Sequence, residues 1–127
     1  MSDAILIARP GTDAEILATR DVMLKLRPNV PADEYLATIR RMMQRDGYRL
    51  VALSEHGRVR AVAGFRFMEL LYVGRIMYVD DLNTDDAYRS RGFGKALMDW
   101  LKDRAREHGC EELHLDSGVA REAAHRS

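Results

Sequence analysis

Cysteine, unbalanced charge and long apolar segments are all scarce in this sequence of 127 residues. Cys110 is the single cysteine, which excludes an internal disulfide and favours the reducing cytoplasm. No apolar run approaches the ~18 residues of a membrane span, and the N-terminal residues lack a basic segment followed by an apolar one. The charges of the 20 basic and 20 acidic residues cancel, so the sequence lacks the net positive charge typical of proteins that bind nucleic acid. We therefore expect a cytoplasmic protein that binds neither membranes nor nucleic acid.

The composition is that of a folded globular domain. Hydrophobic residues make up 46% of the chain and charged residues 31%, which are ordinary values for such domains. This length suffices to bury one hydrophobic core, so we expect one domain over residues 1–127. The 4 histidines show no zinc-binding spacing and the lone cysteine offers no second thiolate, so we expect no metal site.

Hydrophobic periodicity and turn residues predict an α+β domain with the element order β-α-α-β-β-β-α-β-α. Thr12 and Glu15 form a capping box that opens the first helix, which ends before Pro28. His56 and Gly57 separate two β-rich runs, a pattern typical of a hairpin. The full set comprises strands at 5–9, on both sides of 56–57, at 74–84 and at 112–116, and helices at 12–27, 31–47, 93–108 and from 118 onward.

The stretch RSRGFGKALMDW, residues 89–100, joins the strand at 74–84 to the third helix. A helix N-terminus presents unpaired backbone N–H groups and partial positive charge, which suit a phosphate. Gly92 and Gly94 allow a phosphate to approach the backbone, and Arg89, Arg91 and Lys95 can add charged contacts. The glycine spacing fits neither a Walker loop nor a dinucleotide fingerprint. The residues indicate a pyrophosphate turn, unless Gly92 only eases a helix start and the arginines are solvated.

Residues 89–94 also match the signature [Gln/Arg]-x-x-Gly-x-[Gly/Ala], and the whole chain thereby resembles the GNAT N-acetyltransferase superfamily. The resemblance extends to the order of elements from residue 5 onward. It implies a mixed, mostly antiparallel central sheet with helices on both faces. It also implies acetyl-CoA as co-substrate, with its pyrophosphate on Arg91, Gly92, Phe93, Gly94 and Lys95 and its pantetheine arm along the backbone of Leu82, Asn83 and Thr84.

The resemblance further implies that a primary amine attacks the thioester directly, which requires a base, an N–H donor for the oxyanion and an acid for the thiolate. Asp80 and Asp81 lie on the strand where the thioester is expected. Adjacent strand residues point to opposite faces, so one of them could face the acceptor and act as base or hold the amine through a water. The resemblance favours Asp80 slightly, because family members often carry an acidic residue at about this position. The alternative for either residue is a carboxylate paired with a neighbouring arginine.

The C-terminal part departs from the family pattern. Ala124, His125 and Arg126 resemble the start of the stretch that carries the acidic tyrosine in the family, but Ser127 ends the chain just before it. Tyr78 is a candidate replacement for this acid. By this resemblance the last two strands of the family fold are also missing, so we expect an open edge at 112–116. Either a homodimer or larger assembly covers this edge, or the chain is a poorly stable fragment.

These observations leave two functions open. The first is an acetyl-CoA-dependent N-acetyltransferase that acts on a small-molecule or protein amine. The second is a weak or inactive CoA-binding module, in which the pyrophosphate turn is kept and acyl transfer is not. A third interpretation, an α+β domain with an incidental glycine pair, leaves the ordered match to the family unexplained.

Overall fold

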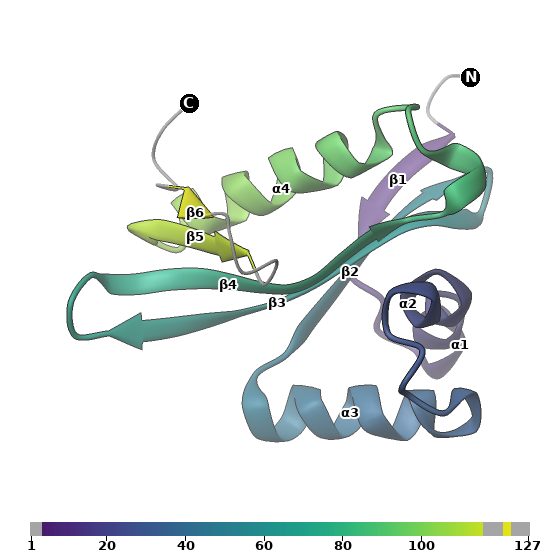
Figure 1. Cartoon of the computed structure of the whole chain (residues 1–127), viewed down its shortest axis with the longest axis horizontal. Helices are drawn as coiled ribbons and strands as arrows, with labels where there is room; N and C mark the ends of the chain where they lie inside the picture. Colours follow the sequence, from purple (N-terminus) through teal and green to yellow (C-terminus); the bar gives the residue numbers. More distant parts are fainter. Residues whose placement is uncertain (1–3, 116–120, 123–127) are drawn as a thin grey trace.

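The computed structural model describes residues 4–115 and 121–122 (Figure 1). The strands are β1 (Ile5–Ala8), β2 (Arg49–Glu55), β3 (Arg58–Leu70), β4 (Gly74–Thr84), β5 (Glu112–Leu115) and β6 (Arg121–Glu122). The α-helices are α1 (Asp13–Leu17), α2 (Arg20–Leu26), α3 (Tyr35–Asp46) and α4 (Phe93–Glu107), with short 3-10 turns at Ala32–Glu34 and Asp86–Tyr88.

The strands form one 6-stranded sheet in the order of the chain, β1 to β6. All neighbouring strands are antiparallel except β4 and β5, which are parallel. Helix α4 covers one face of the sheet, and α1, α2 and α3 lie on the other (Figure 1). The predicted α+β class, with a mixed, mostly antiparallel sheet and helices on both faces, is confirmed.

The first predicted helix is broken in the middle. The Thr12 capping box opens α1 as expected, because the Thr12 hydroxyl accepts from the Glu15 N–H and the Glu15 carboxylate accepts from the Thr12 N–H. The break follows at the fully buried Thr19, whose hydroxyl donates to the Ile16 carbonyl at 2.6 Å and meets the Tyr35 hydroxyl at 2.7 Å. Such a side-chain bond to the preceding turn competes with the helical ladder. The helix expected over 12–27 is therefore the pair α1 and α2.

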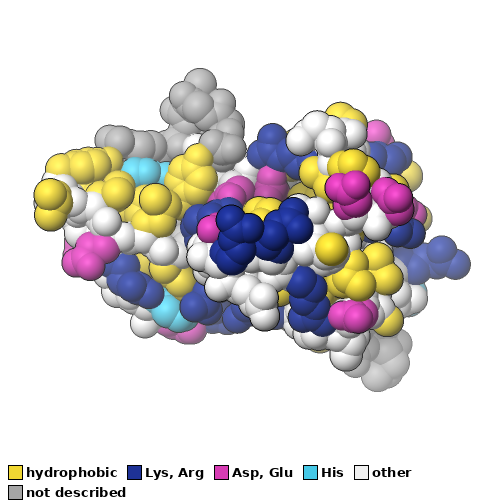
Figure 2. All heavy atoms as spheres, turned by 90° about the horizontal axis from the view of Figure 1, so that it is seen from below, with side chains coloured by type: hydrophobic (Ala, Val, Ile, Leu, Met, Phe, Trp, Pro, Cys, Tyr) yellow, Lys and Arg dark blue, Asp and Glu magenta, His cyan; other side chains and the backbone are white. Residues whose placement is uncertain are grey.

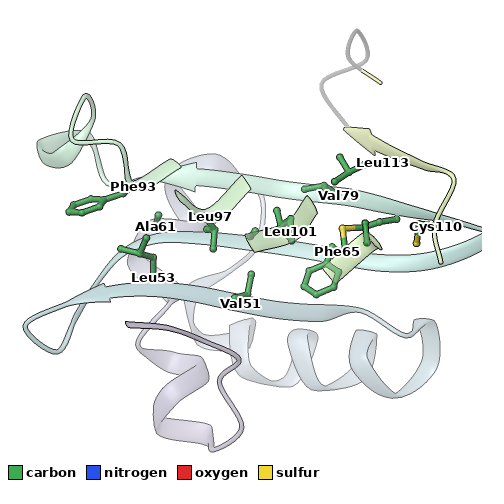
Figure 3. Packing of buried hydrophobic residues seen from close by; sticks show 13 residues of the cluster. Val51, Leu53, Ala61, Phe65, Val79, Phe93, Leu97, Leu101, Cys110 and Leu113 are labelled. Carbon is green, nitrogen blue, oxygen red and sulfur yellow. The ribbon is translucent and has the colours of Figure 1, made fainter. Parts of the chain in front are cut away.

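Side chains alternate between the two faces along the central strands, so the sheet has a separate hydrophobic core on each face. On β2, Val51 and Leu53 pack toward α4, whereas Leu50 and Ala52 pack toward α2 and α3. Figure 3 shows the first core, in which Leu97, Leu101 and Phe93 of α4 lie against side chains of the sheet. The face of α4 that the sequence predicts as apolar is the buried one. Cys110 also belongs to this core, where burial raises the pKa of its thiol.

The chain after β5 differs from expectation. Of the residues predicted to begin a fourth helix, the structure describes Arg121 and Glu122, which form β6 and pair with His114 and Leu113 of β5. The helix prediction is wrong at these two residues, because backbone pairing along a strand edge overrides local helix propensity. The open edge expected at 112–116 is likewise closed at Leu113 and His114. Residues 124–127, compared above with the tyrosine-containing stretch of the family, lie outside the described residues.

Exposed hydrophobic side chains gather where the β3–β4 hairpin projects from the body, at the left of Figure 2. Met68, Leu71 and Tyr72 are exposed there. Elsewhere on this face, basic and acidic side chains are interspersed (Figure 2). No helix within the described residues is long and apolar enough to cross a membrane.

Candidate functional site

A β-bulge at the middle of β4 determines where the predicted acidic residues point. Val79 pairs with Phe65 of β3 and Asp81 pairs with Gly64, so the register skips Asp80. Such a bulge breaks the alternation of side chains along the strand. Asp80 and Asp81 consequently line the same cavity, on the face covered by α2 and α3. The expectation that they point to opposite faces is wrong, and the extra residue is the reason.

Each of these carboxylates is held by an arginine. Both oxygens of Asp80 accept from Arg66 of β3, at 3.2 and 2.6 Å. The Oδ1 of Asp81 accepts from Arg27 Nε at 2.6 Å, and a second nitrogen of Arg27 donates to the Asp80 carbonyl oxygen at 2.7 Å. Arg27 follows the last turn of α2, so this ion pair ties the helix to the bulge. The alternative interpretation of the sequence, a carboxylate paired with a neighbouring arginine, therefore describes both Asp80 and Asp81.

Tyr48 also belongs to this network of hydrogen bonds. Its hydroxyl donates to Asp81 Oδ2 at 2.8 Å, and only 2% of the residue is exposed. Burial, with the Asp81 carboxylate beside it, raises the pKa of the Tyr48 hydroxyl well above its ordinary value, so it stays a donor. A Cβ added at Gly64 would lie 1.7 Å from the Tyr48 hydroxyl oxygen. Only glycine at position 64 leaves room for this ring.

Four residues of this network line a cavity of about 270 Å³ between β4 and the helices α2 and α3, namely Arg27, Tyr48, Asp80 and Asp81. Its charged lining residues are Arg27, Asp80 and Asp81, and the remainder of the lining is mainly apolar. The cavity is a pocket beside β4 in which carboxylates and a buried tyrosine hydroxyl meet apolar walls.

The turn RSRGFG lies on the other side of β4, at the start of α4. Gly92 is the N-cap of α4, with φ of +81°, and no side chain caps the helix there. A Cβ at Gly92 would meet nothing within 4 Å, so the space above it is open. A Cβ at Gly94 would lie 3.2 Å from Thr84 Oγ1. The hollow over this turn measures about 310 Å³ and is lined by Thr84, Tyr88, Arg89, Ser90, Gly92, Phe93, Gly94 and Lys95.

The basic residues of the turn all have acidic partners in this structure. Arg89 donates to Asp86 at 2.9 Å, and Lys95 donates to Asp99 at 3.0 Å. Both pairs are exposed, and exposed pairs contribute little free energy. A phosphate can therefore draw Arg89 and Lys95 away from these partners at small cost.

Arg91 has a more buried partner, Glu55 at the end of β2. Its guanidinium donates to both carboxylate oxygens of Glu55, at 3.3 and 2.8 Å, and Arg60 donates to the same carboxylate at 3.2 Å. The hydrogen bonds from Arg91, with those from Arg60, hold the pKa of Glu55 below its ordinary value. The side chain of Glu55 is 10% exposed. Glu55 thus fixes Arg91 beside the turn.

Asn83 links the two halves of the site. Its amide nitrogen donates to the Val22 carbonyl oxygen of α2 at 3.0 Å, and its amide oxygen accepts from Arg89 at 3.2 Å. The side chain of this predicted pantetheine-binding residue therefore joins the helix beside the cavity to the turn beyond β4.

The outer edge of β4 is available where the resemblance expects pantetheine. β5 pairs with β4 from Ile76 to Val79 only. Leu82, Asn83 and Thr84 pair with β3 on their inner side, and no described strand pairs with them on the other side. Backbone groups at such an edge can pair with an extended ligand.

Sequence reasoning missed Arg27, Tyr48, Glu55 and Arg66. The one local signal for them is Gly64, because a glycine inside a strand often marks a bulge or a close approach. Tyr78, the candidate acid, pairs in register with Arg66 and with His114, and it is not among the residues that line the cavity. Among the described residues, no group of three or more His, Cys, Asp or Glu side chains is arranged to hold a metal ion.

Comparison with known proteins gives the same family. The Acetyltransferase (GNAT) family matches residues 17–127. An uncharacterized N-acetyltransferase of Bacillus subtilis strain 168, YhdJ, is 34% identical over 105 residues, which are 83% of this chain and 74% of that protein.

Solved structures show the same fold. A GNAT family acetyltransferase of Staphylococcus aureus superposes with a TM-score of 0.79 at 15% identity, over 90% of this chain and 87% of that one. The aminoglycoside N-acetyltransferase AAC(6')-Iy in complex with CoA superposes with a TM-score of 0.76 at 18% identity, over 89% and 76%. The chain therefore belongs to the GNAT family of acetyltransferases, enzymes that transfer acetyl groups from acetyl-CoA.

Proposed function

We propose that this protein acetylates a primary amine by direct attack of the amine on acetyl-CoA. The observation that carries the proposal is the arrangement around β4, with an open glycine turn and a free strand edge on one side and an acidic cavity on the other. Acetyl-CoA supplies an activated thioester. In the transfer a C–N bond forms and the C–S bond breaks. The ammonium nitrogen loses two protons in all, one before the attack and one as the amide forms, and the thiolate gains one.

Arg91, Gly92, Phe93, Gly94 and Lys95 are proposed to hold the pyrophosphate. The first-turn N–H groups of α4 lack intrahelical acceptors, and the open space above Gly92 lets an anion reach them. Arg89 is proposed to add a further charged contact from the same turn. This fit supports acetyl-CoA as the co-substrate.

The backbone of Leu82, Asn83 and Thr84 is proposed to pair with the pantetheine arm along the edge of β4. Pairing there would direct the thioester toward the bulge at Asp80, where the strand edge meets the cavity. The buried hydrogen bonds of Asn83 keep this part of β4 fixed against α2.

Asp80 and Asp81 are proposed to act on the amine in different ways. Asp81 accepts from Arg27 and from the buried Tyr48 hydroxyl, and we assign it the role of orienting the ammonium through its charge. Asp80 has Arg66 as its cationic partner and a more exposed side chain, 18% against 11% for Asp81. We assign proton removal to Asp80, with Tyr78 or solvent supplying the proton to the thiolate.

The second candidate, a CoA-binding module without acyl transfer, is favoured by one observation. Asp80 and Asp81 are both neutralised by arginines, as in a purely structural network. Under this alternative the pyrophosphate turn binds CoA and the bulge serves only stability.

Three further points stay predictions. We propose that residues 1–127 form one domain and that the protein acts in the cytoplasm, as composition indicates. A homodimer also stays a prediction. The open edge expected at 112–116 supports it less, because β6 pairs with β5 at Leu113 and His114.

The test is amine-dependent release of the CoA thiol, with the acetylated amine identified by mass spectrometry. We expect turnover by the wild type and a loss of about 10²–10⁴ in kcat for Asp80→Asn. Asp103→Asn removes an exposed acid of α4 that has an arginine partner and lines neither the cavity nor the hollow over the turn, and it serves as the matched control. Acetyl-CoA binding without amine-dependent release would instead support the second candidate.

A further inference from the structure

The cavity beside β4 is small, and its charged lining residues are Arg27, Asp80 and Asp81. Its volume of about 270 Å³ is below the ~300–1,000 Å³ of pockets that hold drug-sized molecules. From the bulge, Asp80 and Asp81 face the cavity, and the opposite walls come from α2 and α3. We propose that the acceptor is a compact monoamine with an apolar body. This inference rests on the proposed acetyl transfer and narrows it to one class of amine.

The walls away from β4 are mainly apolar. Met23 and Ile39 belong to the buried core on the α2 and α3 face of the sheet, and the other apolar wall residues are partly buried against it. Apolar surface removed from water contributes about 25 cal/mol per Å², so a hydrocarbon body is favoured here. The apolar wall residues are Met23, Leu24, Val30, Ile39 and Met42, and Asn29, Tyr35 and Thr38 also line the cavity.

Charge complementarity limits the ligand to one positive group. Asp80 and Asp81 line the cavity and are paired with Arg66 and Arg27, so these four charges sum to zero. The cavity therefore has no surplus negative charge for a second ammonium. A second ammonium at the far end of the ligand would lie against apolar walls, where an uncompensated charge is strongly disfavoured.

A neighbouring hollow could in principle take that second charge. It lies beyond Leu24 and is lined by Asp21, Val22, Lys25 and Asp85 as well. Lys25 opposes a cation there, and Asp85 already accepts from the Ala87 N–H at 3.2 Å. Asp21 and Asp85 against Lys25 leave this hollow with one net negative charge, so a preference for the diamine in the test below would place the second ammonium there.

The reaction follows from this binding mode. The neutral amine nitrogen forms the C–N bond of the amide as the C–S bond of the thioester breaks. One ammonium proton goes to Asp80 before the attack, and the nitrogen releases a second proton to solvent as the amide forms. The thiolate takes up a proton from Tyr78 or solvent. The apolar body stays against α3 and holds the nitrogen at the bulge.

The test compares hexylamine with hexamethylenediamine, which has the same carbon chain and a second amine at its far end. We expect kcat/KM for hexylamine to be at least about tenfold higher. The methyl resonances of Met23 and Met42 should also shift on addition of hexylamine, which reports binding apart from turnover. Equal or preferred turnover of the diamine would overturn the monoamine proposal while leaving acetyl transfer intact.

An acidic substitution in the wall of the cavity tests whether the amine binds there. Met42→Asp adds an acid to the apolar lining and should narrow or reverse the preference for hexylamine. Met43→Asp is the matched control, because Met43 is a half-buried neighbour on α3 that does not line the cavity. An unchanged preference in Met42→Asp, or the same change in both variants, would overturn the assignment of the cavity.

Acetyl-CoA binding on the same samples separates the two proposals. If acetyl-CoA does not bind the folded wild type, the proposed function fails and the acceptor assignment fails with it. If acetyl-CoA binds and only polyamines or protein amines are acetylated, the function stands and the monoamine inference is wrong.

Discussion

Removing the hydroxyl of Tyr48 should destabilise the protein through Asp81. The hydroxyl donates to a carboxylate at 2.8 Å from a residue that is 2% exposed. A hydrogen bond to a charged group contributes about 1.5–3 kcal/mol, and Asp81 would lose one of its donors in a site shielded from water. We therefore expect Tyr48→Phe to lower the free energy of unfolding by about 1.5–3 kcal/mol.

Tyr35→Phe is the matched control for this change. Tyr35 is 1% exposed, and its hydroxyl meets the neutral hydroxyl of Thr19 at 2.7 Å. A bond between neutral groups contributes about 0.5–1.5 kcal/mol, so this variant should lose less than Tyr48→Phe. Urea-induced unfolding of both variants at neutral pH measures the difference.

A double-mutant cycle with Asp81→Asn assigns the effect to the pair. Residues that share a hydrogen bond show interaction energies of about 0.5–3 kcal/mol, and we expect a value in this range for Tyr48 and Asp81. A loss in Tyr48→Phe no larger than in Tyr35→Phe, together with additive effects in the cycle, would refute the reasoning.

The remaining predictions concern neighbouring contacts. Gly64→Ala should lower the free energy of unfolding by about 1–3 kcal/mol, because its Cβ displaces Tyr48, and in urea titrations its effect should be less than additive with Tyr48→Phe. Leu101→Ala removes a fully buried side chain and should cost about 2–5 kcal/mol by the same measurement. The pKa of Glu55 is lowered by Arg91, so the stability that it contributes is present above about pH 4.3 and is lost as pH falls through its lower folded value. The stability difference between the wild type and Glu55→Gln should therefore shrink in acid, and a constant difference would contradict this origin.

Local signals in the sequence were enough to predict most elements. The Thr12 capping box, the left-handed glycines after α3 and α4 and the apolar face of α4 each depend on residues within a few positions of one another. The turn at Gly92 is local in the same sense, because its glycines directly precede the helix that they open. Such features are visible without knowledge of the tertiary structure.

The network at the bulge could not be predicted in this way. It depends on the register between β3 and β4, and a shift of one residue changes which side chains share a face. Arg27 and Tyr48 lie far from Asp81 in the sequence and meet it only because α2 and β2 pack against the same part of the sheet. β6 was missed for a similar reason, since pairing with β5 decides the conformation of Arg121 and Glu122.

Calorimetric titration with acetyl-CoA of the wild type, Gly92→Ala and Gly109→Ala tests the central claim most directly. Gly92 and Gly109 lie at opposite ends of α4 with φ of +81° and +70°, and a Cβ at either would meet nothing within 4 Å. Alanine should therefore strain both backbones alike, by about 1–2 kcal/mol. We predict binding near one acetyl-CoA per chain for the wild type and Gly109→Ala, and much weaker binding for Gly92→Ala. Equal binding by all of these proteins, or none by the folded wild type, would contradict the assignment of the pyrophosphate to this turn.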